Sequence, residues 1–228
     1  MRPFLIAVVA ALAAAAATAP AGGAANECHG IQQCIPVPGP WVVVPAHSSA
    51  EYLLTCPQGR SVVGGVDAEV TSRKVHVSFD ARLGAPVQPG VSTTRYAFFH
   101  AVSTSGRAES FEPFLGCIPT QGGGGRSTVS ARVVSPPGPA LEYRSRIVVI
   151  GPSQIRVARV ACLSSESLVG SWQAIAFRTK NPPALAHVDL VHARIVVTGR
   201  RVTVTASSPD ARAVDAHAIV QAGAECAP

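Results

Sequence analysis

The feature that most constrains this chain is an internal duplication in which each copy is bounded by cysteines. The sequence at Cys56 reads Cys-Pro-Gln-Gly-Arg-Ser-Val-Val-Gly, and the sequence at Cys162 reads Cys-Leu-Ser-Ser-Glu-Ser-Leu-Val-Gly. The copies end alike, in Gly-Cys-Ile-Pro at Cys117 and Glu-Cys-Ala-Pro at Cys226. We interpret this as two copies of one small domain. The spacing predicts one disulfide within each copy, Cys56–Cys117 and Cys162–Cys226.

The two remaining cysteines lie close together near the N-terminus, in Cys28-His-Gly-Ile-Gln-Gln-Cys34. An even cysteine count in an exported chain is typical of a disulfide framework, so a third bond, Cys28–Cys34, is expected to close a short loop. The alternative is a metal held by Cys28, His29 and Cys34, which requires thiolates that an oxidising compartment disfavours.

The N-terminus has the pattern of a secretory signal peptide. Arg2 precedes an apolar run from Phe4 to Ala17, and small residues follow at 19–25. The run is shorter than the roughly 20 residues that span a bilayer. We therefore expect residues 1–25 to be removed on export. The mature chain should carry no membrane span and lie outside the cell or in the cell envelope.

Strand patterns dominate the rest of the chain. Lys74–Asp80 and Arg201–Ala206 alternate strictly between apolar and polar residues, and the apolar face of a last strand from Val214 onward runs in phase with Cys226. Proline-rich segments at 35–40 and 135–139 precede the two copies. Gly151-Pro-Ser153 is expected to form a turn, and helical periodicity is not evident outside the signal peptide.

These patterns predict an all-β protein made of two tandem antiparallel β-sandwich domains, each with one internal disulfide. The expected boundaries are a signal peptide at 1–25, a cystine-closed arm at 26–40 and domain 1 at 41–120. A Gly/Pro-rich linker at 121–139 then leads to domain 2 at 140–228.

The common signatures of catalysis are missing from the sequence. Gly-x-Ser-x-Gly, which exposes a nucleophilic serine, does not occur. Asp67 with Glu69, or Glu109 with Glu112, are the carboxylates that would serve a hydrolase. We predict no catalytic residue and no cofactor. The competing hypothesis is a secreted hydrolase of polysaccharide or peptide that uses carboxylates or a His–Asp pair.

His187 and Asp189 are the candidate metal ligands, since on a strand they would share one face near Arg194. The competing interpretation is that these polar residues form the solvated face of a strand. We favour it and predict no metal site.

The net charge of +6 comes almost wholly from arginine, because Lys74 and Lys180 are the only lysines. A basic excess favours an anionic partner such as an envelope polymer. A genome that enriches Arg, Ala, Gly, Val and Pro together is the alternative explanation. Basic residues are not interleaved with aromatic ones, so nucleic acid is not expected as a partner.

Three segments, at 34–45, 56–65 and 114–119, resemble exported actinobacterial proteins of unassigned function. They include Cys-Ile-Pro-Val-Pro-Gly-Pro-Trp-Val-Val-Val-Pro and Phe-Leu-Gly-Cys-Ile-Pro. The resemblance implies export and a duplicated β architecture. Together these features predict a secreted or envelope-associated binding or structural protein without enzymatic activity. Its expected partner is an anionic envelope polymer or a surface protein, and two linked copies of a binding module would raise avidity.

Overall fold

The computed structural model describes residues 34–57, 61–81, 95–119, 141–208 and 218–228. Its regular structure consists of antiparallel strands, apart from one short helix within these ranges, α1 (Leu185–Val188). The chain is therefore all-β, as the alternation of apolar and polar residues predicts. None of the helices in the described ranges is long and apolar enough to cross a membrane.

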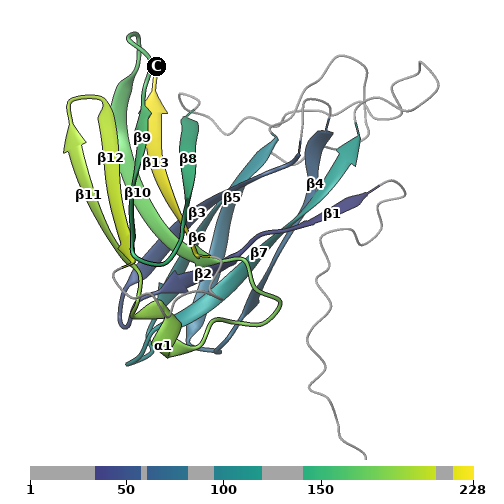
Figure 1. The fold of residues 1–228 in the computed structure, drawn as a ribbon. Helices are drawn as coiled ribbons and strands as arrows, with labels where there is room; N and C mark the ends of the chain where they lie inside the picture. The colour runs from purple at the N-terminus through teal and green to yellow at the C-terminus, as the bar shows by residue number, and fades with distance from the viewer. Residues whose placement is uncertain (1–33, 58–60, 82–94, 120–140, 209–217) are drawn as a thin grey trace, which may run out of the picture.

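The strands fall into two runs along the chain (Figure 1). The first run holds β1 (Ile35–Pro38), β2 (Trp41–Val44), β3 (Ser49–Thr55), β4 (Ser61–Val70), β5 (Val75–Ala81), β6 (Tyr96–Ser103) and β7 (Glu109–Pro119). The second run holds β8 (Glu142–Ile150), β9 (Gln154–Ala161), β10 (Ser167–Phe177), β11 (His192–Thr198), β12 (Arg201–Ser208) and β13 (Ala218–Ala227).

A seven-stranded sheet runs through both halves of the molecule. Its order is β1-β7-β2-β10-β13-β8, and β4 also pairs with β7. The halves meet where β2 pairs with β10, with Trp41 opposite Phe177 and Val42 opposite Ala176. Two three-stranded sheets, β3-β6-β5 and β11-β12-β9, complete the fold.

The second half repeats the strand pairing of the first. Strand β7 pairs with β2 and β4, and β13 likewise pairs with β8 and β10. In the small sheets β6 lies between β3 and β5, and β12 lies between β9 and β11. Strands β2 to β7 therefore correspond one by one to β8 to β13. This correspondence accounts for the sequence similarity that follows Cys56 and Cys162.

Two apolar cores lie on opposite faces of the large sheet. Neighbouring residues of β2 separate them, because Val42 and Val44 belong to one core and Val43 to the other. The first core is shared with β3-β6-β5 and contains Tyr52, and the second is shared with β11-β12-β9 and contains Val204. Successive side chains of a strand point to opposite faces, so the one sheet supports both cores.

Both described disulfides join a small sheet to the large one. Cys56 follows β3 and bonds to Cys117 in β7, and Cys162 follows β9 and bonds to Cys226 in β13. These are the pairs that the spacing predicts. Cys34 is also disulfide-bonded. Cys28 lies outside the described residues, so the Cys28–Cys34 pair stays a prediction.

The two halves also meet through side chains. The carboxamide of Gln221 on β13 hydrogen-bonds to both the N–H and the C=O of Leu53 on β3, and its oxygen accepts the indole N–H of Trp172. Beside it, Phe98 stacks on Tyr143 with ring centroids 4.6 Å apart and meets Trp172 edge-on at 4.8 Å. The halves therefore pack against one another, a point that the sequence leaves open.

Several local expectations can be compared with the structure. Ser153 has φ +54° between β8 and β9, so the turn at 151–153 is confirmed.

The predicted arm at 26–40 contains β1, which pairs with β7 at an edge of the sheet. The prolines of β1 are tolerated there, because the missing N–H groups are not needed for a hydrogen bond between strands. Phe79 is an apolar residue of the alternating segment Lys74–Asp80, and it is half exposed because β5 is an edge strand. The last strand begins at Ala218 within the described residues. Residues 121–139 and 214–217 lie outside them.

Candidate functional site

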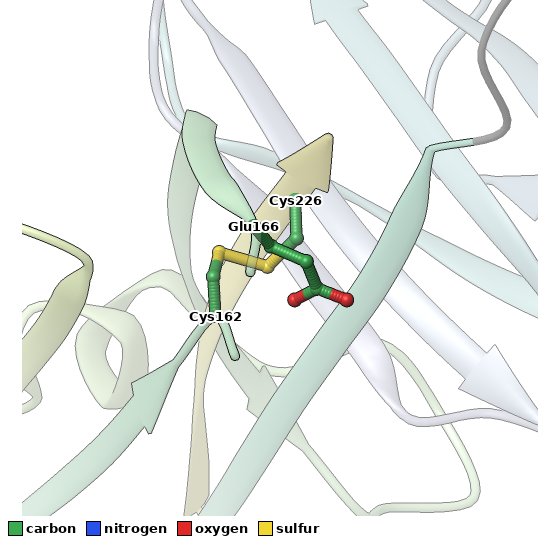
Figure 2. Close-up of side chains that lie close together, drawn as sticks. All are labelled: Cys162, Glu166 and Cys226. Carbon is green, nitrogen blue, oxygen red and sulfur yellow. A yellow bond between two sulfur atoms is a disulfide. The ribbon is translucent and has the colours of Figure 1, made fainter. Parts of the chain in front are cut away.

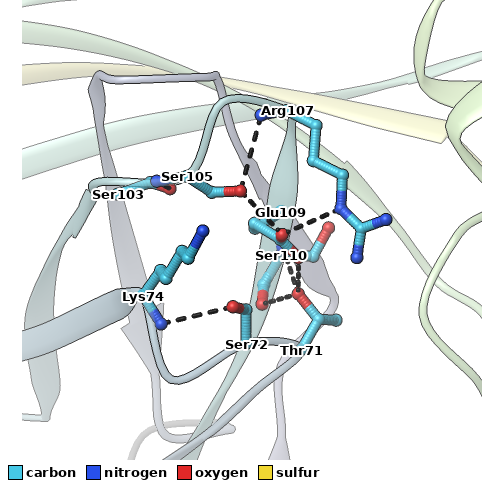
Figure 3. A network of polar contacts seen from close by, with 8 residues as sticks. All are labelled: Thr71, Ser72, Lys74, Ser103, Ser105, Arg107, Glu109 and Ser110. Carbon is cyan, nitrogen blue, oxygen red and sulfur yellow. Dashed lines mark hydrogen bonds and ion pairs between the residues drawn. The ribbon is translucent and has the colours of Figure 1, made fainter.

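The first candidate site is a network of polar side chains around the buried carboxylate of Glu109, at the start of β7 (Figure 3). Ser105 and Thr71 donate their hydroxyls to it, each at 2.9 Å, and Arg107 donates its Nε–H at 3.1 Å. Thr71 also accepts the backbone N–H of Ser110 at 2.9 Å. The network joins the turn after β4 to the turn between β6 and β7.

The charge of Glu109 is stabilised within this network. Burial opposes ionisation, but the hydrogen bonds from Arg107, Ser105 and Thr71 outweigh it, so the pKa of Glu109 lies below its ordinary value. The carboxylate oxygens already accept hydrogen bonds from two hydroxyls and a guanidinium. A general base needs an oxygen free to take a proton from substrate. The network therefore holds two turns together, and we do not assign it a catalytic role.

A second cluster is a pair of carboxylates on the β4–β7 ladder. Glu69 lies directly opposite Glu112 in the register, whereas Glu109 and Glu112 are three residues apart on one strand and point to opposite faces. Burial, and then the charge of Glu69, raises the pKa of Glu112 to about 7. The sequence suggested the pairs Asp67–Glu69 and Glu109–Glu112, but the structure pairs Glu69 with Glu112. Strand register, which sequence reasoning did not establish, makes the difference.

Cys162, Glu166 and Cys226 are the group of three potential metal ligands that converges within the described ranges (Figure 2). The two sulfurs are bonded to each other, so neither offers a thiolate. Glu166 accepts both terminal N–H groups of Arg144, at 2.6 and 2.9 Å, and the backbone N–H of Leu163. Arg144 above all holds the pKa of Glu166 below its ordinary value. The group is thus a disulfide beside an ion pair.

The expectation that His187 and Asp189 share a strand face is wrong. His187 lies in α1 and Asp189 caps its C-terminus with helical backbone angles. At about 100° per residue, positions two apart on a helix point to nearly opposite sides. Arg194 belongs to a separate element, β11. The segment 182–189 contains two prolines and too few residues for a helical stripe, so no sequence signal indicated the helix.

The outer face of the sheet β11-β12-β9 is a third candidate, and we call it the basic face. The inner face contributes Ala158, Val202 and Val204 to the second core. In the register, alternate residues point the other way and are exposed or half-buried. They are His192, Arg194, Val196 and Thr198 on β11, Arg201, Thr203, Thr205 and Ser207 on β12, and Ile155, Val157, Arg159 and Ala161 on β9.

The charged side chains of the basic face are all basic. The face carries three arginines and a histidine, four hydroxyl side chains on β11 and β12, and no carboxylate at any of its positions. Ile155 is 72% exposed, so large apolar side chains also lie open to solvent there. Strands β11 and β12 lie at the outer side of the molecule (Figure 1). The alternation in β12 was visible in the sequence, but the neighbours of β12 were not.

Comparison with known proteins does not extend this description. No protein-family model, curated protein or solved structure matches the chain. Functional inference therefore rests on the residues and their geometry.

Proposed function

We propose that this chain is an exported, non-enzymatic binding protein of the cell envelope or the extracellular medium, and that its basic face holds an anionic envelope polymer. In this proposal the chain consists of two tandem β-sandwich domains, at 41–120 and 140–228, each closed by one disulfide. The repeated strand pairing and the equivalent positions of Cys56–Cys117 and Cys162–Cys226 support that division.

Export by a signal peptide at 1–25 is part of the same proposal. Its support within the fold is the pair of buried disulfides, since such bonds persist in oxidising compartments and are rare in the cytosol. Residues 1–33 lie outside the described part of the chain.

The observation that carries the proposal is the absence of any carboxylate from a face that bears three arginines. Arg159 and Arg194 lie diagonally across β12, which presents Thr203 and Thr205 between them. Arginine binds carboxylate and phosphate through a rigid fork of donors, and threonine hydroxyls add hydrogen bonds to a chain lying across the strands. Apart from the imidazole of His192, the face has no aromatic ring on which bases would stack, which favours a polyuronate or polyphosphate over nucleic acid.

A matched pair of double variants tests the proposal. Arg159→Gln with Arg194→Gln removes two charges from the basic face, and Arg73→Gln with Lys74→Gln removes two exposed charges elsewhere. Binding to alginate oligomers and to polyphosphate is measured by calorimetry at two salt concentrations, with neutral dextran as a control. We expect the first variant to bind at least about tenfold more weakly and the second to bind like wild type.

Each outcome of this experiment decides for or against the proposal. Preference for alginate or for polyphosphate identifies the anion, and weaker binding at higher salt supports charge recognition. Equal loss in both variants would show attraction by net charge alone. That result, or binding to neither polymer, would overturn the proposal in favour of a surface protein as the partner.

One observation favours a second candidate function, a secreted glycan hydrolase. Glu69 and Glu112 form a carboxylate pair in which the pKa of Glu112 is raised to about 7, the value that a general acid needs. Release of reducing ends from an envelope polysaccharide, abolished by Glu112→Gln and by Glu69→Gln but not by Glu142→Gln, would establish it. Unchanged release in the first two variants would exclude this pair.

A further inference from the structure

A cavity of about 700 Å³ opens where the two halves of the molecule meet. Five separate segments line it: the corner between β1 and β2, strand β3, strand β7 at Glu112, strand β8, and the residues that follow β10. None of these segments forms a concave surface alone. The volume lies within the range of 300–1,000 Å³ that is common for small-molecule sites, which often form between domains.

Two cations stand on one side of this cavity. Arg178 and Lys180 follow the end of β10 and line the cavity, and both side chains are exposed. Neither forms an ion pair with a described residue. An anion that enters the cavity therefore meets two positive charges that no carboxylate of the described chain neutralises by direct contact.

The other walls are largely apolar. Val37 and Pro40 from the β1–β2 corner, Leu54 from β3 and Ile147 from β8 line the cavity. Ile147 remains 37% exposed although it lies near the junction of the halves. An apolar body seated against these side chains would remove their surface from water, which is favourable in proportion to the area covered.

Tyr52 adds a polar group to the apolar wall. The residue as a whole is 2% exposed, and no described residue forms a hydrogen bond with its hydroxyl. Burial raises the pKa of Tyr52 to about 12, although nearby Arg178 opposes this, so the phenol is neutral and able to donate a proton in a hydrogen bond. The hydroxyl oxygen is not one of the fully buried polar atoms that lack a partner in the described residues, so it can donate its hydrogen bond to an anion in the cavity.

From these contacts we propose that the cavity binds a small amphipathic carboxylate. Its head is held by Arg178, Lys180 and the Tyr52 hydroxyl, and its apolar body rests between the β1–β2 corner and Ile147. Glu112 is the acidic residue among those that line the cavity, and the negative charge of its carboxylate opposes the binding of an anion. The site is separate from the basic face and does not depend on the proposed function.

Octanoate is the probe for this site, with octanol and octylammonium as neutral and cationic controls. Calorimetry and backbone-amide NMR are recorded on the whole mature chain. We expect octanoate to shift the amides of 52–55 and 178–180, and the two controls to bind at least about tenfold more weakly because they lack the anion.

Variants locate the head of the ligand. Arg178→Gln with Lys180→Gln should weaken octanoate binding about tenfold or more, and Tyr52→Phe several-fold with the ring and the fold retained. Glu112→Gln removes the opposing charge and should strengthen binding several-fold. Arg159→Gln with Arg194→Gln, on the basic face, should leave octanoate affinity unchanged.

Three results with the probes and the cavity variant would overturn the proposal. They are equal binding of octanol and octanoate, full affinity in the Arg178/Lys180 variant, and no binding of octanoate at all. Loss of octanoate binding in the basic-face variant would also contradict it, because that variant does not touch the cavity. Failure of polymer binding with octanoate binding retained would refute the proposed function alone.

Discussion

Gln221 hydrogen-bonds to Leu53 as a second strand would, with its Oε1 2.8 Å from the backbone nitrogen and its Nε2 2.9 Å from the backbone oxygen. The two residues are 168 positions apart in the sequence and lie in different halves of the molecule. Strand β3 is an edge of its own small sheet, so these backbone groups have no ladder partner. The side chain of Gln221 thus supplies hydrogen-bond partners to the backbone of an edge strand and also joins the two halves of the molecule.

We expect Gln221→Leu to lower the free energy of unfolding by about 3 kcal/mol, because it leaves the Leu53 N–H and C=O and the Trp172 indole N–H buried without partners. Chemical denaturation followed by tryptophan fluorescence measures the change. Gln173→Leu is the matched control, since this half-buried glutamine donates one hydrogen bond, to the carbonyl of Ala193. Equal losses in the two variants would contradict a special role for Gln221.

Glu109→Gln should cost about 2 kcal/mol of unfolding free energy at pH 7, because the amide lacks the charge that Arg107, Ser105 and Thr71 stabilise. The folded pKa of Glu109 lies below its unfolded value. Its contribution is therefore complete above about pH 4.5 and is lost as the pH falls through the folded pKa.

The difference between wild type and Glu109→Gln should accordingly shrink under acid conditions. Urea denaturation from pH 3 to pH 7 measures it, with Glu142→Gln at an exposed position of β8 as the control. A difference that stays constant down to pH 3 would show that the charge of Glu109 is irrelevant to stability.

Glu112→Gln should have the opposite pH dependence. The folded pKa of about 7 lies above the ordinary 4.5, so the folded state holds a proton that the unfolded state releases. Wild-type stability therefore declines as pH rises from about 4.5 to about 7. The variant should gain on the order of 1 kcal/mol relative to wild type above pH 7, after allowance for solvent screening. Denaturation at pH 4.5 and pH 8 tests this, and a loss of stability at pH 8 would contradict it.

Removal of either described disulfide should destabilise the protein by about 4 kcal/mol in the chain-entropy model. The Cys56–Cys117 and Cys162–Cys226 bonds close loops of similar length, with sequence separations of 61 and 64. The two double Cys→Ala variants should therefore lose nearly equal free energy in guanidinium denaturation. A large inequality would show that the bonds differ in native packing rather than in loop closure.

Local patterns in the sequence were sufficient for much of the fold. The alternation around Val202 and Val204 predicted a strand with those side chains inward, and both are fully buried. Such predictions succeed because a strand's side chains alternate between its two faces whatever its neighbours are. The equivalent cysteines at 56 and 162 likewise indicated which bonds the structure contains.

Tertiary structure alone decided which strands became neighbours. It placed β2 beside β10 to make one sheet of the two halves, and it set Glu69 opposite Glu112. It gathered Arg159, Arg194 and Arg201 from three strands onto one face, and it brought Tyr52 and Arg178 to one cavity. Alternation determines which face a residue occupies on its own strand. It does not determine pairing or register, because these depend on contacts between segments far apart in the chain.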